Sequence, residues 1–274
     1  FALPQLQAAP ITLSADYPNA EAGFWLRADP IHLRIDRDRL TVLGVPFFQI
    51  NQDEADALVA ALNALFQEDG MVFVAPTPTR WYLRLPQNPN LTFAPLDQAL
   101  GCNMHDYLPS GESALKFHAL LNEMQMVLYG NAVNDARDAC GSPMINSLWL
   151  WGGGDFPLLG APTQTTQILL GGDEIAQAFQ GDMWAPAPAS ASELPPHDTT
   201  VILDSLRLDC VYGNAYEWRQ AWQTLENNWF TPLLASLKAG KIKQLTLTFP
   251  DAQQQVVIKK TDLLKFWRKA KLPF

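Results

Sequence analysis

Residues 131–157, NAVNDARDACGSPMINSLWLWGGGDFP, carry more information than any other part of this chain. The apolar run 145–151 predicts a strand that leads directly into the glycines 152–154. Glycine accepts backbone angles that other residues avoid, so this run lets the backbone approach a ligand closely. Arg137 adds a forked, permanently charged donor that suits a phosphate or a carboxylate. The stretch therefore predicts a place that holds an anion; the alternative is a buried strand followed by an ordinary glycine-rich turn.

The balance of charge restricts the partners that we expect. The chain holds 19 basic and 28 acidic residues, a formal net charge of −9. General binding to nucleic acid or to an anionic membrane depends on neutralising phosphates, so we expect neither partner. No apolar run approaches the roughly 18 residues that a membrane-spanning helix needs. Any bound anion must then be held by locally placed arginines.

Cysteine usage and the first residues bear on the compartment. Cys102, Cys140 and Cys210 are widely spaced and indicate neither a disulfide framework nor a zinc site. We therefore expect a reducing cytoplasm. The chain opens at Phe1 without a charged segment and an apolar run behind it, and we expect that an N-terminal portion of the protein precedes it.

Strand and helix patterns alternate along the chain and predict an α/β protein with a mixed sheet flanked by helices. Hairpins are predicted within 24–42 and 71–85, and helices over 52–67, 110–130, 215–238 and 261–270. The Pro-, Ala- and Ser-rich stretch 186–198 has the composition of a linker. The sequence thus divides into residues 1–185, this linker, and residues 199–274.

Two further residues are candidates for a binding site. Arg27 lies inside an apolar run, where a charge needs either a partner or a bound anion. His105 lies beside Asp106 in a loop segment, where a functional role and a structural one are both open. No P-loop, GxGxxG, GxSxG or HExxH motif is present.

Three phrases together resemble the RpfE-type regulatory proteins of proteobacteria. They are WLRADPIHLRIDRDRL (25–40), the stretch from NMHDYLPSG to LLNEMQM (103–126), and AVNDARDACGSPMINSLWLWGGG (132–154). More distantly, the order of motifs is similar to the archaeal-type cofactor-independent phosphoglycerate mutases of the alkaline phosphatase superfamily. The resemblance implies a remnant of an alkaline-phosphatase-like core with a substrate-cap-like subdomain. Residues 1–185 would supply the cap-like region and the first part of the core, and residues 199–274 its C-terminal part.

The same resemblance implies the ligand residues. Asn134, Arg137 and Asn146 match the mutase pattern of Asn-x-x-Arg followed by Ala-Asn, whereas Trp151 stands where that pattern has an arginine. Together with Arg27 and His105, these residues are the predicted ligand-binding set. The expected ligand is a small phosphorylated acid.

Departures from the mutase pattern bear on catalysis. Mutases of this kind need two metal ions, held by Asp and His side chains, and a serine that carries the phosphoryl group. The positions that resemble the later metal motifs keep Asp209, Thr248 and Asp251 but contain no histidine. The resemblance therefore predicts a catalytically degenerate homologue that acts as a regulatory or small-anion-binding protein, with no catalytic residue, metal ligand or cofactor.

Two alternatives stay open. The first is an active, Mn- or Zn-dependent phosphoglycerate mutase or phosphatase. The second is a protein-interaction module that uses the tryptophan-rich helix 216–230 and the basic end 259–271. An exposed apolar patch around Trp222 and Trp229 would favour the second.

Overall fold

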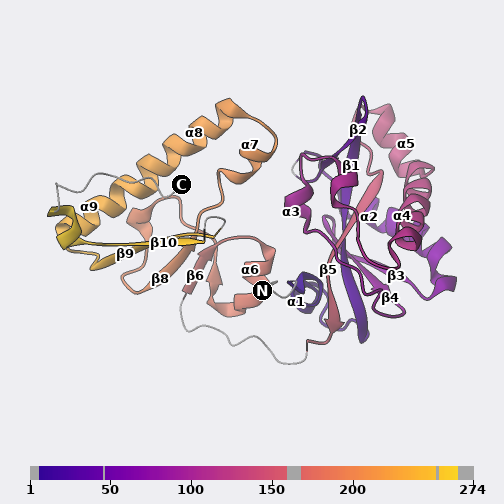
Figure 1. Cartoon of the computed structure of the whole chain (residues 1–274), viewed down its shortest axis with the longest axis horizontal. Helices are drawn as coiled ribbons and strands as arrows, with labels where there is room; N and C mark the ends of the chain where they lie inside the picture. Colours follow the sequence, from indigo (N-terminus) through magenta and orange to yellow (C-terminus); the bar gives the residue numbers. More distant parts are fainter. Residues whose placement is uncertain (1–5, 46, 159–167, 251–252, 265–274) are drawn as a thin grey trace. The chain divides into compact units, whose positions relative to one another are not determined.

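The computed structural model describes residues 6–45, 47–158, 168–250 and 253–264, and the chain forms two compact units. Unit 1 comprises Phe1–Thr165 and Asp173–Gly181, and unit 2 comprises Thr166–Gly172 and Asp182–Phe274. Each unit is described by itself (Figure 1). Among the described residues, no helix combines the length and the apolar character that crossing a bilayer requires.

Unit 1 is built on a five-stranded antiparallel sheet. Its strands are β1 (Gly23–Asp36), β2 (Arg39–Leu43), β3 (Val72–Thr77), β4 (Arg80–Leu85) and β5 (Ser147–Phe156). The order is β2-β1-β4-β3, and β5 pairs with the other edge of β1. Strand β1 is therefore central, and nine of its first eleven residues are buried. A strand buried on both faces accounts for its continuous apolar run, in which Arg27 and Asp29 are the only charged side chains.

Helices cover both faces of this sheet. They are α1 (Ala8–Asp16), α2 (Gln52–Phe66), α3 (Leu96–Ala99), α4 (Ala114–Tyr129), α5 (Ala132–Ala139) and α6 (Glu174–Gln180). Figure 1 shows α1 on one side of the sheet and α2, α4 and α5 on the other. Helix α2 begins with a capping box, in which Asn51 accepts from the Glu54 backbone N–H and the Glu54 side chain accepts from that of Asn51. The predicted helices over 52–67 and 110–130 are confirmed.

The glycine run belongs to strand β5 rather than to a turn that faces a ligand. The pairing of β1 with β5 shifts register between Trp25 and Arg27, and Gly152 has a φ of +64° at this bulge. A Cβ at Gly152 would lie 2.7 Å from the Ala8 side chain, and one at Gly154 would lie 2.9 Å from Gln7. The glycines therefore admit the start of α1 against the sheet. The expectation that they admit a ligand is corrected on this point, since the close approach is made by another part of the chain.

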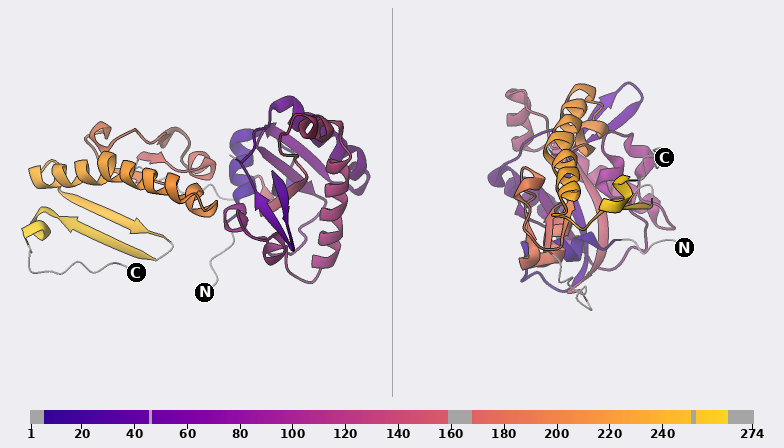
Figure 2. Two further views of the ribbon diagram at one scale, coloured as in Figure 1. Left: turned by 90° about the horizontal axis from the view of Figure 1, so that it is seen from above. Right: turned by 90° about the vertical axis from the view of Figure 1, so that its left-hand side faces the viewer.

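Unit 2 combines a short parallel sheet, a hairpin and a long interrupted helix (Figure 2). Strands β6 (Ile168–Gly171), β7 (Trp184–Ala185) and β8 (Thr199–Ile202) form the parallel sheet in the order β7-β6-β8. Strands β9 (Gln244–Phe249) and β10 (Gln254–Lys259) form the hairpin. The helices are α7 (Arg207–Val211), α8 (Ala215–Leu225) and α9 (Thr231–Ala239), and a π-helical segment, Glu226–Phe230, joins the last two. Pro232 lies in the first turn of α9, directly after this π-helical segment.

The predicted α/β class, with helices flanking the sheets, is confirmed. The described strands lie in three sheets, one antiparallel, one parallel and one a hairpin. Within the expected linker, Ala191 and Leu194 pack against the small core of Leu225, Trp229 and Leu233. The division at 186–198 stays a prediction about organisation. Residues 265–270 of the expected C-terminal helix lie outside the described residues, and Lys260–Leu264 form a 3-10 turn.

Candidate functional site

A buried network of charged side chains lies on the α1 side of the unit 1 sheet. Its centre is Arg27 on β1, which is 2% exposed. The Asp29 carboxylate accepts from Arg27 Nε at 3.0 Å and from Nη2 at 2.7 Å, and Glu174 on α6 accepts from Nη2 at 3.2 Å. Arg27 Nη1 donates to the Thr12 hydroxyl at 3.4 Å, which is a long hydrogen bond and the one that this nitrogen makes among the described residues. Two carboxylates thus share one guanidinium, whose Nη1 side is only weakly engaged.

Trp151 completes the surroundings of this pair. Its indole N–H donates to Asp29 Oδ2 at 2.6 Å, and its ring lies 5.4 Å from the Arg27 guanidinium carbon. Burial raises the pKa of Asp29, against the opposing effects of the Arg27 charge and the Trp151 hydrogen bond. Trp151 stands where the mutase pattern has an arginine. In this chain the position therefore holds a neutral donor, which binds the carboxylate of Asp29, the partner of Arg27. Asp29 was not among the predicted site residues, although Arg-x-Asp on a strand places both side chains on one face.

A second charged pair lies beside the first. Arg80 at the start of β4 donates to both oxygens of Asp16, at 2.7 Å each, and the Tyr82 hydroxyl donates to Asp16 at 2.6 Å. Burial by itself would raise the pKa of Asp16, but the hydrogen bonds from Arg80 and Tyr82 and the nearby positive charge outweigh it, and that pKa is lowered. Burial raises the pKa of Tyr82 above its usual value, so its hydroxyl stays a donor. Asp16 is therefore held as a carboxylate.

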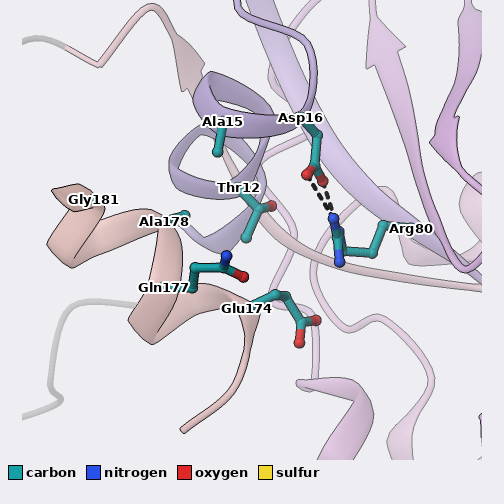
Figure 3. Close-up of a pocket in the computed structure, with 8 residues that line it drawn as sticks. All are labelled: Thr12, Ala15, Asp16, Arg80, Glu174, Gln177, Ala178 and Gly181. Atoms are coloured by element: carbon teal, nitrogen blue, oxygen red, sulfur yellow. Dashed lines mark hydrogen bonds and ion pairs between the residues drawn. The ribbon is translucent and has the colours of Figure 1, made fainter. Parts of the chain in front are cut away.

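These two pairs border a cavity of about 340 Å³ between α1 and α6 (Figure 3). The lining residues are Thr12, Ala15, Asp16, Arg80, Glu174, Gln177, Ala178 and Gly181. Figure 3 shows the Glu174 and Gln177 side chains extending from α6 on one side, with Thr12 and Asp16 on α1 and Arg80 across from them. Thr12 and Glu174 both line the cavity and both bond Arg27, so the buried guanidinium lies directly behind the cavity wall. The lining offers donors from Arg80 and Gln177 beside the carboxylates of Asp16 and Glu174, while the Thr12 hydroxyl already donates to the Ala8 oxygen at 2.9 Å. The donors suit a small polar ligand with an acidic group.

Asn134 and Arg137 lie elsewhere in unit 1, on α5, and brace the connection to β5. The Asn134 amide donates to the backbone oxygens of Leu128 and Ile145 and accepts from the Ile145 N–H, all within 2.8 Å. Arg137 donates to the Glu54 carboxylate and to the backbone oxygens of Pro143 and Gln49, each at 2.8 Å. All three nitrogens of the Arg137 guanidinium are therefore engaged, two of them by carbonyls that the fold holds in place.

Asn146 extends the pairing of two strands. The last backbone pair of β1 with β5 joins Ile31 and Ser147, and just beyond it the Asn146 side chain accepts from the Leu33 N–H and donates to the Leu33 oxygen. Arg27 and Leu33 are six residues apart on β1, which separates them by roughly 20 Å. Arg27 and Asn146 therefore belong to two different places. The predicted ligand set does not form one site.

His105 is exposed and lies in the 3-10 turn Met104–Tyr107. No hydrogen bond joins it to another member of the predicted set within the described residues. Its role stays a prediction.

The described residues do not offer a metal site. No group of three or more His, Cys, Asp or Glu side chains in that part of the chain could hold a metal ion. Of the residues that resemble later metal motifs, Asp209 is partly exposed on α7, Thr248 is exposed on β9, and Asp251 lies outside the described residues. The donor set present in the described residues therefore does not fit a two-metal centre.

Three aromatic side chains in the described part of unit 2 are exposed, and they are Tyr216, Trp218 and Trp222. Trp218 and Trp222 on α8 stack with ring centroids 6.3 Å apart, and they are 41% and 46% exposed. Trp229, in contrast, is buried in the unit 2 core. The apolar patch expected around Trp222 and Trp229 thus involves Trp222 but not Trp229.

Comparison with known proteins shows a distant similarity to one kind of enzyme. No family model matches the chain. A probable 2,3-bisphosphoglycerate-independent phosphoglycerate mutase from Geobacter sulfurreducens is 26% identical over 148 residues, which are 53% of this chain and 36% of that protein. The match therefore covers about a third of the relative's length. The chain is distantly similar to cofactor-independent phosphoglycerate mutases.

Solved structures give weaker likenesses. The cofactor-independent phosphoglycerate mutase from Thermoplasma acidophilum matches with a TM-score of 0.43 and 13% identity, over 81% of this chain and 66% of that one. The PH0037 protein from Pyrococcus horikoshii matches with a TM-score of 0.38 and 11% identity, over 81% and 59%. At these TM-scores neither structure establishes a common fold.

Proposed function

We propose that this protein is a non-catalytic relative of the cofactor-independent phosphoglycerate mutases and that it binds a small phosphorylated acid in the α1–α6 cavity. It would serve as a regulatory protein of a reducing compartment, of the RpfE type that the sequence resembles. The three cysteines are free, in keeping with such a compartment. The ligand class comes from the distant similarity to a probable phosphoglycerate mutase.

One observation carries the location of the site. Arg27 is 2% exposed, is permanently charged, and lies behind two lining residues of the cavity, Thr12 and Glu174. Its Nη1 group makes a single long contact among the described residues. Arg80, with its side chain 28% exposed, borders the same cavity. A phosphate or carboxylate in the cavity would contact Arg80 directly. Only the Thr12 and Glu174 side chains would separate it from Arg27.

Two observations favour binding over phosphoryl transfer. The positions that resemble the metal motifs contain no histidine, and the described residues contain no metal-ligating cluster. The charged groups around the cavity are paired as ions, with Arg80 on Asp16 and Arg27 on Asp29 and Glu174. Such pairs orient a ligand by hydrogen bonds, and the described residues that line the cavity include no serine of the kind that carries the phosphoryl group in the mutase pattern.

Isothermal titration with 3-phosphoglycerate tests this proposal. The wild-type protein should bind, and Arg80→Met should weaken binding at least tenfold because it removes the charged donor that lines the cavity. Arg84→Met is the matched control, since Arg84 lies on the same strand, is paired with Glu21 and does not line the cavity. Equal binding by both variants, or no binding of any phosphorylated three-carbon acid by the wild type, would remove the proposal.

A metal-dependent mutase or phosphatase is the second candidate, because the curated relative is named as a probable mutase. It requires metal ligands outside the residues that the structure describes. It predicts Mn²⁺- or Zn²⁺-dependent turnover of 3-phosphoglycerate and metal in elemental analysis of the full-length protein. An inactive full-length protein that takes up no metal would exclude it.

Contact with a protein partner is a third role, favoured by the exposed stacked pair Trp218 and Trp222. Quantitative affinity capture with wild-type and Trp222→Ser protein tests it. A captured set that is identical for the two proteins would remove this role.

A further inference from the structure

Glu174 is the most weakly held carboxylate in the Arg27 network. Its oxygen lies 3.2 Å from Arg27 Nη2, whereas Asp29 accepts from the same guanidinium at 2.7 and 3.0 Å. The Glu174 side chain is 35% exposed and that of Asp29 is 4% exposed. Trp151 also anchors Asp29 through a 2.6 Å hydrogen bond, and no such second donor holds Glu174 among the described residues. Of the two carboxylates on Arg27, Glu174 is therefore the one that can exchange.

The charge balance around Arg27 disfavours a third acid group while both carboxylates stay bound to it. One guanidinium already faces two carboxylates, and Arg80 on the cavity wall is already paired with Asp16 through Nε and Nη2. A ligand acid group at Arg27 would add a like charge within contact distance of Glu174, in a place with little water to screen it. Binding at Arg27 and the Arg27–Glu174 contact are therefore alternatives.

We infer that Glu174 holds the position on Arg27 that the acid group of the ligand takes, so that α6 carries a built-in competitor of ligand binding. This inference rests on the proposed function, since it concerns the regulation of that same cavity. The exchange leaves the start of α6 intact, because its N-cap is Asp173, which accepts from the N–H groups of Ile175 and Ala176. What changes on binding is the tie between α6 and β1. The protein thus reports an occupied cavity by releasing α6.

Titration of Glu174→Gln with 3-phosphoglycerate tests the inference directly. Glutamine keeps the shape of the side chain and an oxygen acceptor, and it removes the competing charge at a partly exposed position. We expect binding about tenfold tighter than that of the wild type, because one like charge next to the bound acid group is gone. Glu123→Gln is the control: it is an exposed carboxylate on α4 that makes the same change in net charge away from the cavity.

Hydrogen–deuterium exchange supplies a second measurement on the wild-type protein. Saturating 3-phosphoglycerate should speed amide exchange in α6 while leaving α2 unchanged, because only α6 is tied to Arg27 through Glu174. Slower amide exchange in α6 with the ligand than without it would show that binding stabilises this helix, and would overturn the inference.

The outcomes separate the inference from the proposed function. If the wild type binds and Glu174→Gln binds equally or more weakly, the inference is overturned and the proposed function stands. If Glu174→Gln alone binds, Glu174 blocks the cavity against this ligand, and the proposed function of the wild-type protein is overturned. If neither protein binds, both are overturned.

Discussion

Arg27 and Arg137 are both buried arginines of unit 1, but their partners differ. Arg27 faces two carboxylates from different segments and lies behind a cavity, whereas Arg137 faces one carboxylate and two backbone oxygens. Backbone oxygens are held in place by the fold, while a carboxylate on a side chain can move away. The partners of a buried arginine, more than its burial, therefore separate a structural cross-link from a site that can open to a ligand.

Of the substitutions considered, the removal of Arg27 should cause the largest loss in the free energy of unfolding. In Arg27→Met, the fully buried Asp29 and the partly exposed Glu174 lose their counter-charge, and an uncompensated buried charge costs about 3–5 kcal/mol. Urea denaturation measures this loss in the free energy of unfolding. A loss under about 1 kcal/mol would mean that the two carboxylates become protonated or hydrated at little cost in free energy. Arg27 would then not differ from Arg137 in its contribution to stability.

Arg137→Met should cost less, about 2 kcal/mol, because it leaves two backbone oxygens and a carboxylate that is 23% exposed. The same variant should bind 3-phosphoglycerate as tightly as the wild type in isothermal titration, since Arg137 does not line the cavity. Lost binding at unchanged stability would return the anion site to α5, where the sequence alone had placed it.

The close approach of α1 to β5 can be tested with a pair of glycines. In Gly152→Ala the new side chain would sit at a φ of +64°, and its Cβ would lie 2.7 Å from that of Ala8. We therefore expect a loss of about 2 kcal/mol in the free energy of unfolding, from backbone strain and steric overlap together. Gly141 has a φ of +73° with nothing within 4 Å of its added Cβ, so Gly141→Ala carries the backbone strain alone, about 1 kcal/mol. Thermal or urea unfolding compares the two. Equal losses would show that α1 shifts away from β5 at no cost.

Asp16→Asn should have the smallest effect and one that depends on pH. The lowered pKa of Asp16 means that its carboxylate stabilises the fold above its unfolded pKa near 4, and that this contribution is lost as the pH falls through the lower folded value. At pH 7 the variant should be about 1 kcal/mol less stable than the wild type, since Arg80 is partly exposed. Unfolding measured between pH 7 and pH 2 should show this gap closing below about pH 4. A gap that stays constant over this range would contradict the charged pairing of Asp16 with Arg80.

Much of the local structure could be predicted from the sequence. The helices predicted over 52–67 and 110–130 correspond to α2 and α4, each within a few residues at its ends. The two strand pairs of unit 1 follow from alternation and turn residues. These features depend on neighbours in the chain, and for that reason they can be read without the fold.

The candidate site could be predicted only in part. Arg27 stood out because a charge in an apolar run needs a partner, and the fold supplies Asp29 from the same strand. Glu174 comes from a position 147 residues further along the chain, and no local pattern points to it. Asn134, Arg137 and Asn146 matched a binding pattern, yet the amides and the guanidinium are used to hold the α5–β5 connection.

By itself, the sequence determined that this chain has an α/β fold, that Arg27 must be neutralised, and that residues 152–154 permit a close approach. The sequence did not show which segment packs against residues 152–154 or which residues neutralise Arg27. The tertiary structure decided both, since it brings α1 onto the glycines and Glu174 onto the arginine. The physical reason is that propensity and periodicity act over a few residues, whereas burial and ion pairing depend on which distant segments meet.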